Sequence, residues 1–346
     1  MKTTTLIGID LAKNVFQLHG VDDNGRKVFD RKLTRGQVVP FFANLPSCAV
    51  AMEACASSQY WARVIEELGH EVKRLPAQFV TPYRRGNKTD ATDAAAICEA
   101  AQRPNMRFVP NKSHDQADIQ AVHRVRNGFV QGRTAVLNRA RGLLGEYGII
   151  IPQGAAHVRK HLICILDDVL PTELSGLMRG LLQTLYTHLV RLEEEIEALD
   201  KQLRIICQNR EECKRLMKIP GIGPMNATSL VCLCGHASNF NKSRAFASFL
   251  GLTPKEFSSG GKQRLSGITK RGNSYARSLL VHGARAVLRA IQRGHSPYGG
   301  GRMEEWIKRL IERRGMNKAC VALANKMARI AWRLIVYKED FRPAMA

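Results

Sequence analysis

The sequence predicts a mixed fold in which an α/β domain comes first and a mostly α-helical region follows. Three observations predict it. The first 75 residues contain five short apolar runs of strand length, separated by turns and by two helical patterns. Apolar residues after residue 114 recur at helical spacing instead. Aromatic residues make up only 6% of the chain, so helices built on Leu, Ile, Val and Ala should dominate.

The N-terminal runs are expected to form one sheet. Residues 5–10, 15–21 and 27–33 read as an antiparallel meander, with a turn at Asp22-Asp23-Asn24-Gly25 between the second and third strands. Helix 37–45, strand 49–53, helix 60–68 and strand 71–75 then alternate, which predicts parallel strands with crossover helices. This order resembles the ribonuclease-H-like nuclease fold. It differs from a Rossmann unit, since no G-x-G-x-x-G follows the first strand.

Four carboxylates lie at chemically suggestive places in this domain. Asp10 and Glu53 each end an apolar strand, so neighbouring strands can direct them at one point. Asp90 and Asp93 are three residues apart in a predicted helix from 90 to about 101, N-capped by Thr89, and therefore share a face. Such oxygen ligands suit Mg²⁺ or Mn²⁺, and two ions about 4 Å apart could assist cleavage of a phosphodiester. The alternative is that each acid only caps its element.

The charge distribution favours a nucleic-acid partner. The formal net charge is +23, yet residues 1–100 hold 13 Lys and Arg against 11 Asp and Glu, so the rest of the chain is a polycation. A membrane surface is disfavoured because no apolar run is long enough to span a bilayer. A strand pattern that starts at once after Met1, with no signal peptide, and nine scattered cysteines predict a cytoplasmic protein with reduced thiols. Beside the acids, Arg84, Arg85 and Lys88 are candidate phosphate contacts or simple counter-charges.

Two long helices are expected in the middle of the chain. The first spans residues 115–147 and carries His123, Arg124 and Arg126 on its polar face, where the arginines are candidate nucleic-acid contacts or ordinary solvated charges. The second has a heptad seam over residues 178–206. This seam needs a partner helix. We expect a homo-oligomer, a dimer or a tetramer, with the preceding basic helix as the alternative partner. Parallel and antiparallel pairing both stay open.

The C-terminal part contains two further signals. The turn Ile219-Pro220-Gly221-Ile222-Gly223 resembles the hairpin of helix-hairpin-helix modules, although a plain turn between helices is also consistent with it. Residues 304–336 read as one amphipathic helix.

A serine- and glycine-rich turn lies in a strongly basic stretch. No acidic residue occurs between Glu256 and Glu304, where nine Lys and Arg occur. A serine hydroxyl in such surroundings could act as a nucleophile in phosphoryl transfer, although Ser-Gly turns also commonly connect secondary-structure elements without any catalytic role. The cations that crowd around this turn are Lys262, Arg264, Lys270, Arg271 and Arg277.

Together these motifs resemble the DEDD insertion-sequence transposases, the bridge-RNA-guided recombinases of the IS-one-ten and IS-eleven-eleven group. The motifs are G-I-D-L-A-K at Asp10, M-E-A at Glu53, N-K-T-D-A-x-D, I-P-G-I-G, G-L-T-P, S-S-G-G and K-R-G-N. The match runs from Asp10 to at least Arg277. The chain departs from the family at Ala56, where members often carry glycine, and this position bears on backbone shape rather than on the ligands.

The resemblance implies a RuvC-like domain at residues 1–105, a basic helix and coiled-coil region at 106–212, and a transposase domain at 213–346. It implies that Asp10, Glu53, Asp90 and Asp93 bind magnesium. It also implies that Ser259, or else Ser258, attacks a DNA phosphate to form a covalent protein–DNA intermediate. In the family, acids and serine come from different subunits of a dimer or tetramer. A noncoding bridge RNA pairs there with target and donor DNA.

The hypothesis is therefore an RNA-guided DNA transposase or recombinase. The first alternative is a metal-dependent, structure-selective nuclease of the Holliday-junction resolvase kind, which would use the acids and leave the serine idle. The second is a non-catalytic nucleic-acid-binding protein in which the acids are structural.

Overall fold

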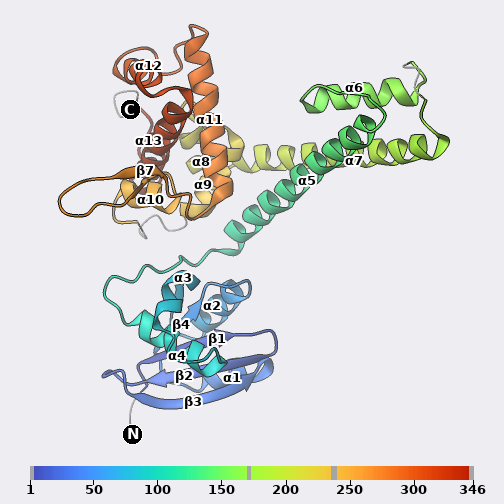
Figure 1. Ribbon diagram of the computed structural model, residues 1–346. Coiled ribbons are helices and arrows are strands. Elements are labelled where there is room, and N and C mark those ends of the chain that lie inside the picture. Colours follow the sequence, from blue (N-terminus) through green and yellow to red (C-terminus); the bar gives the residue numbers. More distant parts are fainter. Residues whose placement is uncertain (1–3, 170–172, 235–239, 343–346) are drawn as a thin grey trace. The chain divides into compact units, whose positions relative to one another are not determined.

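The computed structural model describes residues 4–169, 173–234 and 240–342. It divides into two compact units, Met1–Ser113 and His114–Ala346. Each unit has its own hydrophobic core. Figure 1 shows the helices and strands of both units.

The first unit is built on a five-stranded sheet. Its strands lie in the order β3-β2-β1-β4-β5. β1 pairs antiparallel with β2 and parallel with β4, β2 pairs antiparallel with β3, and β4 pairs parallel with β5. The predicted meander and the two parallel strands are confirmed. The strands are β1 (Leu6–Leu11), β2 (Val15–Val21), β3 (Lys27–Thr34), β4 (Ala49–Glu53) and β5 (Glu71–Leu75).

Helices cover this sheet and bury its apolar side chains. Ile9 and Met52 belong to one core cluster, with Trp61 of a covering helix. Ile97 belongs to a second cluster that contains Leu6 of β1. The helical elements are η1 (Arg35–Gln37), α1 (Val38–Ala43), α2 (Ser58–Glu67), α3 (Ala77–Val80), η2 (Thr81–Tyr83) and α4 (Asp90–Ala101).

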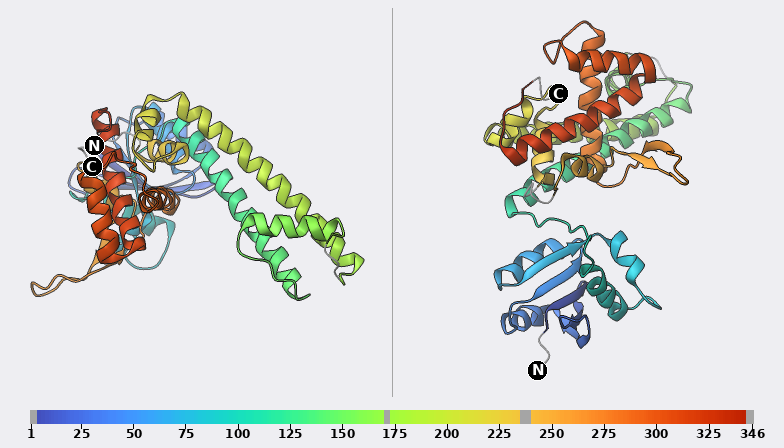
Figure 2. Two further views of the ribbon diagram at one scale, coloured as in Figure 1. Left: turned by 90° about the horizontal axis from the view of Figure 1, so that it is seen from above. Right: turned by 90° about the vertical axis from the view of Figure 1, so that its left-hand side faces the viewer.

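The second unit begins with three helices that pack on one another, α5 (His114–Gly145), α6 (Ala155–Leu166) and α7 (Gly176–Gln208). Leu182 and Leu189 of the heptad seam are buried in one cluster with Leu144 of α5 and Leu162 of α6. The alternative interpretation therefore holds for these positions, because the seam has a partner within its own chain. Figure 2 shows α5 and α7 side by side. None of the sequence patterns described above predicts α6.

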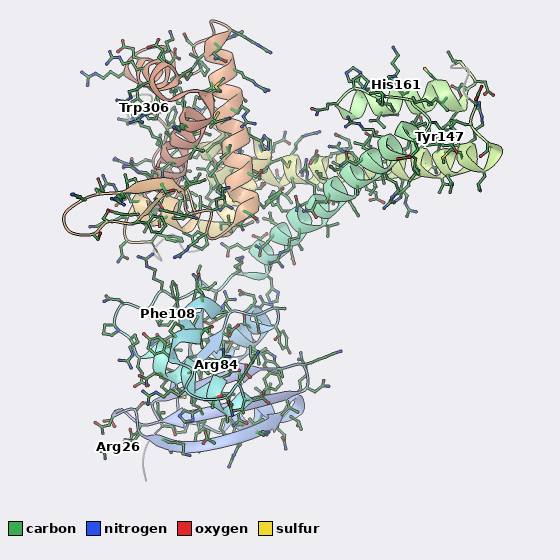
Figure 3. All side chains as sticks on the ribbon, viewed as in Figure 1. Arg26, Arg84, Phe108, Tyr147, His161 and Trp306 are labelled. Carbon is green, nitrogen blue, oxygen red and sulfur yellow. The ribbon has the colours of Figure 1, made fainter. Side chains whose placement is uncertain are left out.

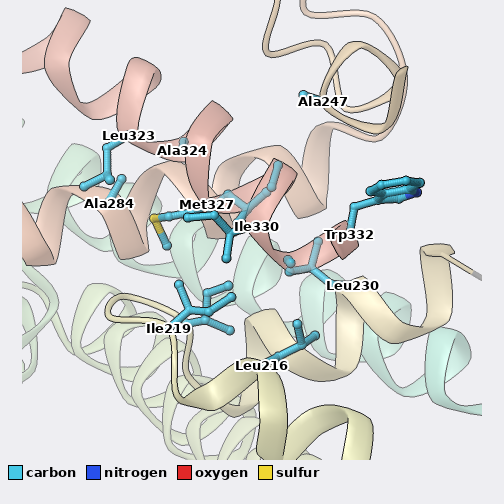
Figure 4. Packing of buried hydrophobic residues seen from close by; sticks show 14 of the residues in the cluster. Leu216, Ile219, Leu230, Ala247, Ala284, Leu323, Ala324, Met327, Ile330 and Trp332 are labelled. Atoms are coloured by element: carbon cyan, nitrogen blue, oxygen red, sulfur yellow. The ribbon is translucent and has the colours of Figure 1, made fainter. Parts of the chain in front are cut away.

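The remaining helices surround the largest core, part of which Figure 4 shows. Its members include Leu216, Leu230 and Met327. The expected single helix over residues 304–336 is wrong, because Gly315 at φ +78° separates two helices. The elements are α8 (Glu211–Met217), α9 (Pro224–Cys234), α10 (Ser243–Phe249), β6 (Pro254–Glu256), β7 (Leu265–Ile268), α11 (Ser274–Gln292), α12 (Arg302–Arg314) and α13 (Met316–Tyr337).

The glycine-rich turn between α8 and α9 packs against α11. Gly221 has φ +88°, and a Cβ atom on it would lie 2.8 Å from the carbonyl oxygen of Gly283. Ile219 and Ile222 on either side are buried in the core. Packing between helices alone therefore accounts for glycine at position 221.

All nine cysteines are free. Within the described ranges, none of the helices combines the length and the apolar character that crossing a membrane requires.

Candidate active site

Two of the four carboxylates are brought together by the register of the sheet. In the parallel pair of β1 and β4, Ile9 lies opposite Met52, and the next residues are Asp10 and Glu53. Because the carboxyl ends of parallel strands meet at one edge of a sheet, both acids leave the sheet at the same place. Both are partly exposed, whereas the residues before them are buried. The strands therefore fix the backbone of each acidic residue and leave its carboxylate partly exposed to solvent.

Helix α4 supplies the other two acids. It begins at Asp90, and its predicted N-cap is confirmed, because the Thr89 hydroxyl accepts a hydrogen bond from the Thr92 backbone N–H at 3.2 Å. Asp90 and Asp93 both fall in the first turn. The helix approaches β1 closely, since a Cβ atom on Gly8 would lie 2.4 Å from the Ala94 carbonyl oxygen. Glycine in β1 thus allows α4 to lie against the strand that carries Asp10.

The four carboxylates share one electrostatic environment. The pKa of Asp10 is raised to about 6, first by burial and then by the negative charges of Asp93, Asp90 and Glu53, while Lys88 opposes the rise. The Asp10 carboxyl is therefore partly protonated just below neutral pH. The three elements that carry these charges pack on one another, since α4 contacts both β1 and β4.

This donor set suits a hard divalent cation in its chemistry, since all four side chains offer carboxylate oxygens. Among the described residues, no three His, Cys, Asp or Glu side chains are grouped closely enough to hold one metal ion. Asp93 is instead held by Arg84, whose Nη1 lies 3.1 Å from its Oδ1. Figure 3 labels Arg84 among the side chains of the first unit. An arginine thus neutralises part of the acidic cluster, and metal binding by all four acids would require the side chains to draw together.

The predicted nucleophile lies on a different element, the hairpin of β6 and β7. Ser259 and Lys262 bridge across its tip, with Gly260 and Gly261 between them at φ +54° and +74°. Positive φ at both central residues is the mirror-image two-residue turn typical of hairpins, and the Lys262 N–H donates to the Ser259 carbonyl at 3.0 Å. Ser259 is exposed, so its hydroxyl is accessible.

The two candidate serines differ in their hydrogen bonds. The Ser258 hydroxyl donates to Glu256 Oε1 at 2.6 Å and accepts from the Arg264 backbone N–H at 3.3 Å. In the described part of the chain, the Ser259 hydroxyl makes no such bond. The geometry therefore leaves Ser259 the freer of the two.

The candidate nucleic-acid contacts fall into two groups. Two of the arginines are engaged within the chain: Arg126 forms a two-nitrogen ion pair with Asp200, and the Arg277 guanidinium donates to the carbonyls of Leu250 and Arg271 at 3.0 Å. Arg84, already described, is a third. The remaining seven are exposed and available, namely Arg85, Lys88, Arg124, Lys262, Arg264, Lys270 and Arg271.

His123 is not on the polar face of α5 as predicted, because it is buried. Its Nδ1 lies 3.0 Å from the Tyr275 hydroxyl and its Nε2 lies 2.9 Å from the Thr228 hydroxyl, which joins α5 to α11 and α9. Burial lowers its pKa to about 4, with Arg126 contributing. The sequence feature that indicates its burial is its position four residues after Ile119, which is also buried and lies on the same face of the helix.

Comparisons with known proteins match both halves of the chain. A model of DEDD transposases related to IS110, described as "Transposase", matches residues 7–149, and one described as "Transposase IS116/IS110/IS902 family" matches residues 213–299. A probable family 20 transposase of Pseudomonas aeruginosa is 46% identical over 97% of this chain and 98% of its own. The transposase for insertion sequence element IS1111A of Coxiella burnetii is 41% identical, over 99% and 92% respectively. That for IS1328 of Yersinia enterocolitica is 40% identical, over 96% and 97%.

Proposed function

The chain belongs to the IS116/IS110/IS902 transposase family, and from this premise we propose that it cuts and rejoins DNA by a serine nucleophile assisted by divalent metal. The family and the relatives make it an insertion-sequence transposase, an enzyme that acts on DNA. The single observation that most supports the chemistry is the arrangement of the elements that carry the acids: Asp10 and Glu53 end the paired strands β1 and β4, and α4, which begins with Asp90 and Asp93, packs against β1. The domain that carries them is proposed to be RuvC-like, which the strand order and the crossover helices support.

The acidic cluster is proposed to hold Mg²⁺ or Mn²⁺ through Asp10, Glu53, Asp90 and Asp93. When bound, such a cation would polarise a phosphodiester and stabilise negative charge on the leaving oxygen. Asp10 and Glu53 keep fixed positions because their strands are anchored in the core. The positive charge of Lys88 lowers the pKa of Asp10. Lys88 and the exposed Arg85 are suited to hold the DNA backbone beside the acids.

The proposed serine step is a transesterification. The Ser259 Oγ forms a bond to phosphorus while one P–O ester bond of the DNA breaks. The hydroxyl proton of the serine leaves to a base, and the displaced oxygen takes up a proton to become a free DNA hydroxyl. Attack by a DNA hydroxyl on the serine phosphodiester reverses these events and joins the strands. Lys262 and Arg264, exposed near Ser259 on the hairpin, are suited to stabilise the phosphate during both steps.

Guidance by a bridge RNA and assembly into a dimer or tetramer are part of the same proposal. Base pairing with the guide would recognise the DNA sequence, and the protein would only have to bind the phosphate backbones of the nucleic acids. A polycation of net charge +23 with 6% aromatic residues suits this task. Sequencing RNA that co-purifies with the protein tests this part. RNA from the flanks of the element supports guidance, and its absence contradicts it.

A transposition assay with Ser259→Ala, Ser258→Ala and Asp10→Asn tests the chemistry. We expect Ser259→Ala and Asp10→Asn to abolish strand exchange and Ser258→Ala to retain it. A DNA-linked protein band on denaturing gels should vanish with Ser259→Ala. A Ser259→Ala protein that still cuts DNA would instead identify a metal-dependent nuclease. Unchanged cleavage and transposition by Asp90→Asn would favour the structural role of the acids.

Mixing Asp10→Asn with Ser259→Ala protein tests whether the two groups are supplied by different subunits. Each variant lacks one group, so strand exchange by the mixture, but by neither alone, would support a composite assembly. An inactive mixture would assign both groups to one chain.

A further inference from the structure

The C-terminal helix α13 carries a cavity that the proposed chemistry does not use. Its volume is about 450 Å³. Three cations and two aromatic rings contribute to its wall, together with one hydroxyl and one carboxylate. These residues are Ser243, Lys326, Arg329, Trp332, Arg333, Tyr337 and Glu339.

Two of the three cations of this cavity form no ion pair with a described acid. Its one acid, Glu339, is engaged by Arg333 at 3.1 Å. The Lys326 ammonium lies 4.8 Å from the centre of the Trp306 ring, a contact that attracts a cation without neutralising it. No described carboxylate forms an ion pair with Lys326 or Arg329. Two half-buried positive charges therefore face the cavity without a counter-charge.

Two donors in the wall also lack acceptors. Arg329 Nε and Trp332 Nε1 are buried and make no hydrogen bond to any described residue. Both atoms belong to side chains that line the cavity, and both lie beneath its surface. In Figure 4 the Trp332 indole lies at the margin of the core cluster, away from Leu323 and Ala284. The acceptor that fits such a wall is an anion with several oxygens, and a phosphate matches the guanidinium fork of Arg329.

The rim of the cavity offers a stacking surface. Tyr337 is 60% exposed, and its ring meets the ring of Trp332 at 6.0 Å and 89°. This edge contact holds the Tyr337 ring against Trp332 and leaves the rest of the ring exposed to solvent. A nucleobase next to a bound phosphate could stack there, provided that it is not already stacked and paired in a duplex.

We propose that this cavity binds one phosphate of a single-stranded nucleic acid through Lys326 and Arg329, with the adjoining base stacked on Tyr337. This site rests on the proposed function only in that the chain acts on nucleic acid. Single-stranded DNA and RNA present the same phosphate and an unpaired base, so the experiment includes both.

Binding to short labelled probes tests the site in the full-length protein. The probes are five-residue oligothymidylate and oligouridylate and a 12-base-pair duplex, measured by fluorescence anisotropy across a salt series. We expect Tyr337→Ala to weaken single-strand binding roughly fivefold or more. We expect Arg329→Met to flatten the slope of log Kd against log salt by about 0.7, the value for one phosphate contact. The matched control is Lys318→Met, which removes an exposed cation at the other end of α13.

Thermal unfolding separates a binding role from a structural one. Because the Arg329 charge is partly buried without a partner, Arg329→Met should leave Tm unchanged or higher. Tyr337→Ala at the exposed rim provides a second variant that does not depend on the fold of the wall.

The outcomes assign or reject the site. Weaker binding of the DNA probe, the RNA probe or both, with duplex binding intact, supports it and identifies the strand. Variants that match Lys318→Met on all probes overturn it, as does a lower Tm of Arg329→Met with single-strand binding unchanged. Loss of strand exchange by Ser259→Ala is measured separately, so a failure here leaves the proposed serine chemistry standing.

Discussion

Arg84 and Asp93 form an ion pair, with Arg84 Nη1 3.1 Å from Asp93 Oδ1, although Asp93 is one of the three acids whose charges raise the pKa of Asp10. The guanidinium thus occupies a carboxylate that a metal ion would need. Both side chains are partly buried, at 29% and 22% exposure, so screening by solvent is incomplete. The pair makes Arg84 a competitor of any cation at the acidic cluster.

Removing this competitor should strengthen metal binding. We expect Arg84→Met to lower the Mn²⁺ concentration for half-saturation several-fold, because Asp93 no longer has to exchange one cation for another. Electron paramagnetic resonance of free Mn²⁺ measures this directly. Arg85→Met is the matched control, since Arg85 is exposed and has no ion pair with a described carboxylate. Equal affinities of the two variants would contradict the prediction.

The buried His123 predicts a loss of stability at acidic pH. Its pKa is about 4 in the folded protein against 6.5 for an ordinary histidine, so the unfolded chain binds a proton that the folded chain does not. The neutral His123 therefore contributes fully to the free energy of unfolding above about pH 6.5. This contribution, roughly 3 kcal/mol, is lost as pH falls toward 4. Urea unfolding of the wild type and of His123→Gln, from pH 7 to pH 4.5, measures it. Parallel pH profiles for the two proteins would disprove the assignment.

The turn at Gly221 predicts a clear contrast between two neighbouring glycines. Gly221→Ala would place a Cβ atom against Gly283 and force alanine into φ +88°, which should cost about 2 kcal/mol or more. Gly223→Ala meets nothing within 4 Å and serves as the control. We expect Tm to fall by several degrees for the first substitution only. Similar values of Tm for both would mean that packing on α11 does not require the glycine.

Because α7 packs against α5 and α6, only its exposed side chains are free to form contacts between subunits. Leu189 is fully buried within the chain, whereas Leu177 and Leu181 of the same helix are 78% and 45% exposed. Replacing both exposed leucines with serine should reduce the mass measured by light scattering if assembly uses α7. Leu189→Ala should instead destabilise the protein by about 2 to 5 kcal/mol with the mass unchanged. A lower mass for Leu189→Ala alone would point to the seam itself.

Local rules predicted most of the first unit. Strand periods and the turn at Asp22–Gly25 gave the five strands nearly to the residue, because β1, β2 and β4 bury most of their residues and the turn ends β2. Thr89 marked the start of α4 for a reason that is also local, since a cap involves only its own turn. The neighbouring positions of Asp10 and Glu53 then followed from the parallel pairing of β1 and β4.

Long-range packing explains what the sequence did not reveal. Residues 304–336 have an unbroken amphipathic pattern, and only the backbone angle of Gly315 divides it. His123 and Arg126 look like surface residues of a basic helix until Tyr275 and Asp200 meet them from distant segments. The cavity beside Trp332 combines α10 with α13, which no local pattern indicates.

Among the described strands, β6 and β7 pair with each other alone, and Ser259 lies at the exposed tip of their hairpin. A two-stranded ribbon of this kind is marginally ordered on its own in water. Under the proposed serine chemistry, contacts with the DNA would have to offset the entropy lost when the hairpin is ordered. The chain alone would then react slowly with stray DNA and would become competent only when bound DNA orders the hairpin.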